Sequence, residues 1–377
     1  MIMPDASNKD KLLFTPGPLT TSQTVKQAML RDLGSRDTEF IESVGRIRQQ
    51  LLAIAGVSQA AGYEAVLMQG SGTFTIESVI SSAIPPDGKL LMIVNGAYGE
   101  RIVKMAAIHR IPTTVLKYAE NQIPDVDEVR KTAAADPAIR MIAIVHCETT
   151  SGIMNPIDEV GSIARELDKD YFVDSMSAFG AVPFDLAACN IDYLVSSANK
   201  CIEGVPGFGF AICRREKLVA TAGWARTLSL DLLDQWKGLE SNGQFRFTPP
   251  THTILAFEQA LNELAAEGGV HGRARRYREN YECLIAGMRK MGFEEYVPAD
   301  LQGYIITSFH YPRDETFDFE EFYQRLNERG FVIYPGKVTD ADCFRIGNIG
   351  RIFAEDVRAL LAAIAEATVA RRGSEGH

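Results

Sequence analysis

Short, uninterrupted apolar runs separated by amphipathic stretches constrain the fold of this chain most strongly. These runs cover residues 65–68, 90–94, 113–116, 141–145, 171–173, 193–195 and 208–212. Continuous apolar runs, as opposed to alternating ones, are typical of strands buried on both faces of a mostly parallel sheet. Helical patterns lie between them, at residues 74–82, 100–109 and 158–167. The sequence therefore predicts an α/β fold with helices on both faces of the sheet.

The later part of the chain has a different pattern. Residues 253–291 predict one or two long helices, with a break at Gly268 and Gly269. A strand (304–309), a helix (319–329), two strands (331–334 and 343–346) and an Ala-rich helix (354–370) follow, which predicts a smaller α+β domain. We therefore expect an N-terminal arm (1–20), a large α/β domain (21–265) and a small C-terminal domain (266–377).

Composition excludes several classes of function. The net charge of −10 argues against non-specific binding to nucleic acid or to anionic membranes. The short basic stretch 273–278 is followed by Glu279, and we interpret it as a solvated helix face. No apolar run approaches the roughly 20 residues of a membrane span. The first residues lack the apolar core of a secretory signal, so we expect a cytoplasmic protein.

The cysteines and histidines do not predict a metal site. The six cysteines are scattered along the chain without metal-type spacing, and the six histidines form no local cluster with them. The cysteines are interpreted as buried or free thiols; they are Cys147, Cys189, Cys201, Cys213, Cys283 and Cys343.

An acid and a lysine follow two of the predicted strands. Asp174 ends the run 171–173, and Lys200 comes shortly after the run 193–195. Pyridoxal phosphate (PLP) requires an amine to form a Schiff base and a carboxylate to keep its pyridine nitrogen protonated. A lysine in a polar loop is ordinarily a solvated surface residue, so this pair indicates PLP chemistry only together with other features.

Three loops after predicted strands add such features. Gly70-Ser71-Gly72-Thr73 opens a predicted helix, where free amides and hydroxyls can bind phosphate, although a plain strand-to-helix turn has the same pattern. Tyr98, in a Gly-rich loop, can stack on a flat ring, or else simply pack. The polar segment 146–152 follows the strand ending at Val145, where open α/β sheets bind ligands.

Two features of the later chain can contribute to a site. Arg345 is a lone arginine in an apolar strand, and a buried arginine requires an anion, from either an internal salt bridge or a ligand. Thr248 precedes Pro249 and Pro250, which prevent a helix from starting earlier.

These segments, in this order and spacing, resemble the class V aminotransferases of PLP fold type I over nearly the whole chain. The motifs are 13–19 (LFTPGPL), 35–37 (SRD), 70–73 (GSGT), 95–99 (NGAYG), 146–152 (HCETTSG), 173–177 (VDSMS), 197–200 (SANK) and 344–347 (FRIG). The resemblance implies a large PLP-binding domain with a mostly parallel sheet between helices, a small C-terminal α+β domain and an aminotransferase activity. A small amino donor and a 2-oxo acid acceptor are the implied partners.

The resemblance also implies roles for individual residues. Lys200 would carry the cofactor and move the proton, Asp174 would pair with the ring nitrogen, and Tyr98 would stack on the ring, with Thr149 near the ring hydroxyl. Arg345 would hold the acidic end of the substrate. Gly17 and Arg36 are the other candidate substrate-binding residues, and whether Arg36 contacts the substrate or only an internal acid stays open. The phosphate would be bound by Ser71, Gly72, Thr73 and Asn199, and by Thr248 of the neighbouring subunit, which implies a homodimer.

Several alternatives stay open at this point. Alanine- or serine-dependent transaminases with glyoxylate or pyruvate as the acceptor would keep the same cofactor residues. A PLP lyase or cysteine desulfurase would need a mobile cysteine, whereas Cys201 is adjacent to Lys200. A non-enzymatic binding module is disfavoured by the presence of both Lys200 and Asp174.

Overall fold

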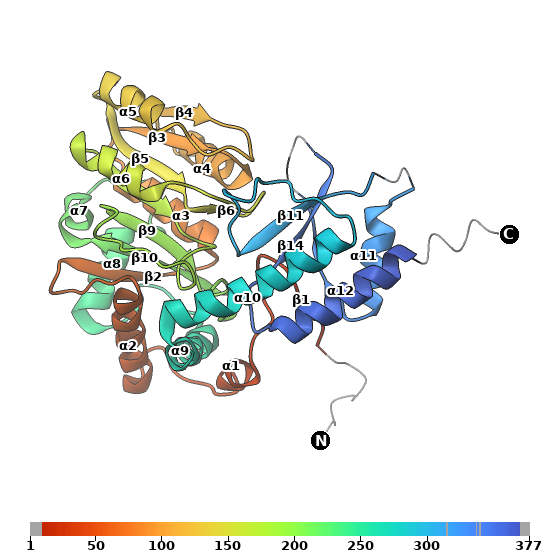
Figure 1. Ribbon diagram of the computed structural model, residues 1–377. Helices are drawn as coiled ribbons and strands as arrows, with labels where there is room; N and C mark the ends of the chain where they lie inside the picture. The colour runs from red at the N-terminus through yellow and green to blue at the C-terminus, as the bar shows by residue number, and fades with distance from the viewer. Residues whose placement is uncertain (1–9, 314–315, 337, 339–340, 370–377) are drawn as a thin grey trace.

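The computed structural model describes residues 10–313, 316–336, 338 and 341–369. Its centre is a seven-stranded sheet that lies between helices on the left of Figure 1. In spatial order the strands are β2 (Tyr63–Gln69), β10 (Phe208–Arg214), β9 (Tyr193–Ser197), β8 (Asp170–Asp174), β5 (Ile139–Val145), β3 (Lys89–Val94) and β4 (Thr113–Lys117). Every strand predicted between residues 60 and 215 is part of this sheet, which confirms the α/β prediction.

The sheet is mostly parallel, as predicted. Strands β9, β8, β5, β3 and β4 are parallel, whereas β10 is antiparallel to both of its neighbours, β2 and β9. β2 consequently has the same direction as the parallel strands. The carboxyl ends of all strands except β10 therefore lie at one edge of the sheet, which is the edge at which open α/β sheets bind ligands.

The predicted helices flank the sheet as α3 (Gly72–Ala83), α4 (Ala97–Ile108) and α6 (Ile157–Glu166). The helices that the sequence patterns did not identify are α1 (Gln23–Ala28), α2 (Thr38–Ile54), α5 (Val126–Ala135), α7 (Arg215–Ala220) and α8 (Leu232–Asn242). α2 illustrates their local cause: the Asp37 side chain caps it by accepting from the Glu39 amide, and Phe40, Val44 and Ile47 are buried along one face.

The long helical region divides where the glycines predicted it. α9 (Thr251–Ala266) ends just before Gly268, and α10 (Gly269–Lys290) begins just after it. Gly268 and Gly269 have φ angles of +97° and +68°, a left-handed conformation that glycine adopts without steric cost. α10 then extends from the large sheet toward the second part of the molecule (Figure 1).

The second part contains a three-stranded antiparallel sheet in the order β11 (Ile306–His310), β14 (Cys343–Gly347) and β13 (Tyr334–Pro335). It also contains α11 (Phe319–Glu328) and α12 (Ala354–Val369). The strand predicted over 331–334 is divided, because β12 (Phe331–Val332) pairs with β1 (Leu12–Leu13) while β13 pairs with β14. β6 (Cys147–Glu148) and β7 (Ile153–Met154) form a separate ribbon.

The prediction of a solvated basic face at residues 273–278 is wrong for two of its arginines. Arg273 is 0% exposed and Arg276 is 8% exposed, because their guanidinium groups bind Glu203 and Glu267. Arg276 Nη2 lies 2.8 Å from Glu203 Oε1, and Arg273 Nε lies 2.8 Å from Glu267 Oε2. Buried charges are tolerated when they are paired in this way. The cluster joins α10 to the segment that follows Lys200.

The chain ends lie largely outside the described residues, so the predictions for residues 1–9 and 370–377 concern parts that the structure does not describe. None of the helices within the described ranges combines the length and apolar character needed to cross a membrane.

Candidate active site

The carboxyl edge of the large sheet brings together the residues that the sequence singled out after five strands. Ser71 to Thr73 follow β2, Tyr98 follows β3, Thr149 follows β5, Asp174 ends β8 and Lys200 follows β9. β3 and β5 are neighbours although β4 lies between them in sequence, so the strand order reverses direction here. Such a switch point opens a crevice outside the strand ends.

Lys200 lies against the N-terminal segment of the chain. Its Nζ donates a hydrogen bond to the carbonyl of Pro16. A Cβ at Gly17 would lie 3.0 Å from Lys200 Nζ, so the glycine gives the amine its space. Burial lowers the pKa of Lys200, which favours the neutral amine over the ammonium form. A neutral amine is the form that can attack a carbonyl or accept a proton.

Asp174 is a buried carboxylate at the end of β8. It is 1% exposed, and its Oδ1 accepts a hydrogen bond of 3.0 Å from the Met176 amide. Burial raises the pKa of Asp174 to about 6, although that hydrogen bond and the positive charges of Lys200 and Arg101 each lower it in part. No ion pair of Asp174 within 4.0 Å occurs among residues 10–313, 316–336, 338 and 341–369. The carboxylate is thus suited to a cationic partner.

Replacing Asp174 by asparagine should stabilise the cofactor-free protein above pH 6. An aspartate carboxyl in the unfolded chain has a pKa near 3.8, and burial raises the pKa of Asp174 to about 6 in the folded state. The folded form therefore binds more protons than the unfolded one between these values, so wild-type stability falls as the pH rises through that window and stays lower above it. The difference corresponds to about 3 kcal/mol.

Urea unfolding of the cofactor-free wild type and Asp174→Asn at pH 4 and pH 8 measures this effect. The stabilisation should be present at pH 8 and small at pH 4. Asp87→Asn is the matched control, because Asp87 is exposed. An equal difference at both pH values would show that ionisation of Asp174 costs the fold nothing.

The loop after β2 provides anion-binding groups at the start of α3. The Ser71 side chain makes no capping hydrogen bond to the helix, and the residue is exposed. A Cβ at Gly72 would lie 2.3 Å from Met176 Sδ, so a larger residue there would require the Met176 side chain to move. Amides at a helix N-terminus together with hydroxyls bind phosphate. Ser197 connects this loop to Asn199: a Cβ at Gly72 would lie 3.2 Å from Ser197 Cβ, and the Ser197 hydroxyl donates to Asn199 Oδ1 over 3.1 Å.

Tyr98 is fixed in the first turn of α4 by a residue that the sequence patterns did not identify. The Arg101 guanidinium lies 4.8 Å from the centroid of the Tyr98 ring, and Arg101 Nη1 donates to Thr73 Oγ1 over 3.3 Å. Arg101 thereby connects the aromatic ring to the phosphate-type loop. Its position three residues after Tyr98, on the same side of the helix, was the only signal in the sequence.

Glu148 lies in the 146–152 motif, although the sequence patterns indicated no role for it. Glu148 is 0% exposed, and its carboxylate accepts hydrogen bonds from the Thr150 amide (3.1 Å) and the Gly99 amide (3.4 Å). Thr150 Oγ1 in turn accepts a hydrogen bond of 3.0 Å from the Ala97 amide. Glu148 and Thr150 thus cap the start of α4, whose own N-cap, Gly96, has no side chain. Burial raises the pKa of Glu148 to about 7.

Arg345 faces this cluster from the three-stranded sheet. It is 1% exposed, and Nε and Nη1 donate to the carbonyls of Pro335 (3.0 Å) and Thr149 (2.8 Å). No salt bridge to Arg345 occurs in the described part of the chain, so the internal ion pair considered from sequence is not found there. Burial lowers the pKa of Arg345, and the neighbouring Tyr98 and Glu148 side chains raise it in part. An anionic ligand would supply the missing counter-charge.

Two of the predicted site residues are not joined to this cluster. Arg36 is exposed ahead of α2, and no hydrogen bond or ion pair within the described ranges links it to Lys200, Asp174 or Arg345. Thr248 is also exposed, and its carbonyl accepts a 3.5 Å hydrogen bond from the Gln69 side chain.

The two cysteines next to the candidate site residues, Cys147 and Cys201, do not have the character of a nucleophile. Cys201 is buried, its thiol donates to the Ser177 carbonyl, and burial raises the pKa of Cys201 to about 12. Burial also raises the pKa of Cys147 far above its usual value. A reactive cysteine needs the thiolate form and access to the substrate. The geometry therefore disfavours a desulfurase.

The residues of the cluster fit PLP. The buried carboxylate of Asp174 lacks an ion-pair partner among the described residues. Lys200 is an amine whose pKa is lowered by burial, and a loop suited to phosphate precedes α3.

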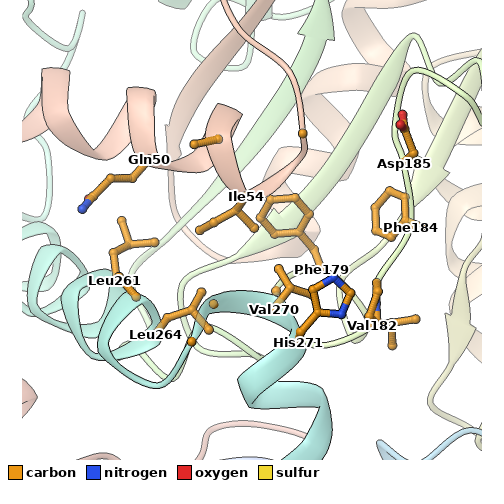
Figure 2. A pocket seen from close by; sticks show the side chains of 17 residues that line it. Gln50, Ile54, Phe179, Val182, Phe184, Asp185, Leu261, Leu264, Val270 and His271 are labelled. Carbon is orange, nitrogen blue, oxygen red and sulfur yellow. The ribbon is translucent and has the colours of Figure 1, made fainter.

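A distinct cavity of about 500 Å³ is shown in Figure 2. It is lined mainly by apolar side chains such as Ile54, Phe179 and Leu264, and includes none of the cluster residues, so we assign no chemistry to it.

Comparison with known proteins gives consistent results. A family profile described as "Aminotransferase class-V" matches residues 19–345. Proteins of Salmonella paratyphi C and Salmonella typhimurium, both named 2-aminoethylphosphonate–pyruvate transaminase, are 54% identical over 360 residues, covering 95% of this chain and 98% of theirs.

Solved structures share the fold. An alanine–glyoxylate aminotransferase from Nostoc sp. has a TM-score of 0.88 at 23% identity, covering 98% of this chain and 97% of its own. A pyridoxamine–pyruvate aminotransferase from Mesorhizobium loti has a TM-score of 0.87 at 22% identity, covering 98% and 94% respectively.

Proposed function

The chain belongs to the class V aminotransferases, which are PLP-dependent enzymes, and from this premise we propose that it transfers the amino group of 2-aminoethylphosphonate to pyruvate. The products are phosphonoacetaldehyde and L-alanine; the C–P bond stays intact, so the reaction is a step of phosphonate catabolism that precedes cleavage of that bond. The observation that carries the choice of an acidic substrate is Arg345, a buried guanidinium that forms no salt bridge within the described residues. The names of the curated relatives support the choice of phosphonate and pyruvate.

Two groups act on the reacting atoms. PLP, when bound, supplies the carbonyl group that exchanges with the amine and a ring that withdraws electrons from the reacting carbon. Lys200 would hold the cofactor covalently and would move the proton at the substrate carbon, which its lowered pKa favours. Asp174 would keep the ring nitrogen protonated, because a buried carboxylate and a pyridinium stabilise each other.

Other residues hold the cofactor in place. Ser71, Gly72, Thr73 and Asn199 bind the phosphate through hydroxyl, amide and carboxamide groups. Tyr98 would stack on the cofactor ring, and its own ring contacts the Arg101 guanidinium. Thr149, whose carbonyl accepts a hydrogen bond from Arg345, would bind the ring hydroxyl.

Arg345 holds the acidic end of each substrate in turn. A guanidinium can bind either a carboxylate or a phosphonate, so one residue can bind the amino donor in the first half-reaction and pyruvate in the second. Gly17 contributes space beside Lys200, where a Cβ would lie 3.0 Å from Nζ. Arg36 is exposed in its own chain, so in this proposal it would contact substrate only in the site of a partner subunit.

The enzyme is a homodimer in this proposal. Thr248 is exposed and would reach the phosphate in the neighbouring subunit. It is flanked by Phe247, which is 44% exposed, and the Gln69 side chain donates to the Phe247 carbonyl over 2.8 Å. Phe74, next to Thr73, is 50% exposed. Exposed aromatic residues beside a binding loop are typical of a subunit interface.

We propose a cytoplasmic location. We also propose that the chain divides into an N-terminal arm (1–20), a large domain (21–265) and a small domain (266–377). The break before α10, which begins at Gly269, supports the second boundary.

The visible absorption spectrum of the purified enzyme tests the proposal. The PLP-loaded protein should be yellow, and its band should bleach when 2-aminoethylphosphonate is added without an acceptor and return when pyruvate follows. A band that bleaches with alanine or serine, but not with 2-aminoethylphosphonate, would replace the donor and indicate the alanine or serine transaminases. A protein that takes up no PLP would refute the cofactor assignment.

A further inference from the structure

The backbone that follows Lys200 turns sharply at Glu203. The Glu203 amide donates a hydrogen bond of 2.7 Å to the Lys200 carbonyl, which closes the turn 200–203. Glu203 has a φ angle of +66°, a left-handed conformation that is uncommon for a residue with a side chain. Such a conformation persists only where the surrounding structure enforces it, and it is frequent at active sites. The contacts that hold Glu203 therefore also determine the course of the backbone at Lys200.

The Glu203 carboxylate is held by side chains of α10. Glu203 is buried, and its Oε1 accepts hydrogen bonds from the Tyr277 hydroxyl (2.6 Å) and from Arg276 Nη2 (2.8 Å). Arg273 Nη1 lies 3.4 Å from the same oxygen and also donates to the Cys201 carbonyl. Hydrogen bonds that involve a charged group are stronger than those between neutral groups. Buried charged groups thus fix the turn at two of its four residues.

The same side chains bind the segment that follows β14. Arg276 Nη1 donates to the Gly350 carbonyl over 2.6 Å, and the Gly350 amide donates to the Tyr277 hydroxyl over 3.1 Å. A hydroxyl can accept from one group while it donates to another, and the Tyr277 hydroxyl does both, since it also donates to Glu203. One hydroxyl therefore joins the turn after Lys200 to the chain that leaves the three-stranded sheet.

The N-terminal segment of the described chain restrains Lys200 from its other end. The Gly347 amide, at the end of β14, donates to the Phe14 carbonyl over 3.0 Å. Two residues after Phe14, the Pro16 carbonyl accepts the hydrogen bond from Lys200 Nζ. The lysine is therefore held at its backbone carbonyl through Glu203 and at its amine through Pro16, and both restraints lead to the chain around β14.

From these contacts we propose that Glu203 and Tyr277 are positioning residues for Lys200, which hold the turn so that the lysine amine reaches the reacting carbon. This inference rests on the proposed function and adds to it two residues outside the site. A proton is transferred efficiently only across a hydrogen-bond distance of roughly 2.6–3.2 Å, so a small displacement of the amine slows the reaction. Arg345 is fixed by two other backbone carbonyls, so substrate binding does not depend on this turn.

Tyr277→Phe tests the inference, because it keeps the ring against Arg276 and removes only the hydroxyl. We expect two rate constants to fall by about tenfold through the loss of one charge-assisted hydrogen bond. The first describes the capture of PLP by the cofactor-free protein, seen as growth of the visible band. The second describes the bleaching of that band in the loaded enzyme by saturating 2-aminoethylphosphonate. The half-saturating concentration of this amine should change by less than about threefold.

These rate constants separate positioning from folding. A rate constant does not depend on how much of the enzyme is folded, so a merely structural defect would lower only the amplitudes. Glu203→Gln, which removes the charge but keeps an oxygen acceptor, should slow both steps as well. Tyr281→Phe is the matched control, because Tyr281 lies one turn further along α10 and packs against the apolar core of the second part of the molecule. It should leave both rate constants unchanged.

Unchanged rate constants in a folded Tyr277→Phe enzyme, or reduced amplitudes alone, would overturn the inference while leaving the transaminase intact. If Tyr277→Phe does not fold, the same outcomes in Glu203→Gln decide. A wild-type enzyme whose band does not respond to 2-aminoethylphosphonate would overturn the proposed substrate instead. The capture of PLP by the cofactor-free variants would still report on the positioning of Lys200 in that case.

Discussion

Lys200→Ala should abolish transamination while the protein stays folded. The side chain supplies both the amine that holds the cofactor and the group that moves the proton, and no other residue is assigned either function. We expect turnover with 2-aminoethylphosphonate and pyruvate to fall by about 10³-fold or more. The fold loses little, because the only hydrogen bond that Nζ makes within the described residues is to the Pro16 carbonyl.

Three measurements separate chemistry from folding in this variant. Steady-state rates report turnover, thermal unfolding reports stability, and mass spectrometry after borohydride reduction shows whether the cofactor becomes fixed to the protein. The wild type should gain the cofactor's mass, and the variant should not. Lys200→Arg should be equally inactive, because a guanidinium stays protonated and cannot accept the proton. Lys104→Ala, at an exposed position of α4, is the control.

Full activity in Lys200→Ala would refute the assignment of this lysine. Loss of activity together with loss of the thermal transition would leave Lys200→Arg as the deciding variant, since it retains charge and length. A folded and active Lys200→Arg enzyme would likewise contradict the proton-transfer role.

Arg345→Ala should raise the KM for both substrates by about 30-fold or more. The side chain is 1% exposed, and removing a charged donor from a desolvated site typically costs about 2–5 kcal/mol. The KM should rise for the donor and for pyruvate alike, because both place their acidic group here. The spectrum of the bound cofactor should persist, since the predicted cofactor contacts come from other residues.

The variant also loses hydrogen bonds to Pro335 and Thr149, so stability must be measured beside the kinetics. Arg345→Lys retains the charge but not the planar guanidinium, and we expect an intermediate KM with a folded protein. Arg358→Ala, at an exposed position of α12, controls for the loss of a cation from the same part of the molecule. Unchanged KM values in a folded Arg345→Ala enzyme would make this arginine structural.

Much of the fold could be predicted from local sequence patterns. The strands of the large sheet were located correctly because each is a continuous apolar run buried on both faces, as in β3 and β9. The break between α9 and α10 was predicted because two adjacent glycines permit the left-handed backbone found at Gly268 and Gly269. Helices such as α8 were missed, although Asp231 caps α8 by accepting from the Asp234 amide.

The parts that could not be predicted depend on contacts between distant residues. Arg273 and Arg276 appeared solvent-exposed because Glu203, which lies about 70 residues earlier, gives no local signal of pairing with them. Arg101 and Glu148 appeared unremarkable for the same reason. Only the order of β3 and β5 in the sheet brings the start of α4 next to Glu148 and Thr150.

The sequence by itself determined the α/β class, the strands and the residue types that PLP chemistry requires, because apolar runs, glycines and motif spacing are local properties. Only the tertiary structure decided which of those residues meet. It buries Asp174 with no ion pair among the described residues and places the Arg101 guanidinium over the Tyr98 ring. It also ties Arg345 to two backbone carbonyls and leaves Arg36 at the surface. Desolvation and pairing set the charge and reach of such groups, and both depend on neighbours that chain order does not reveal.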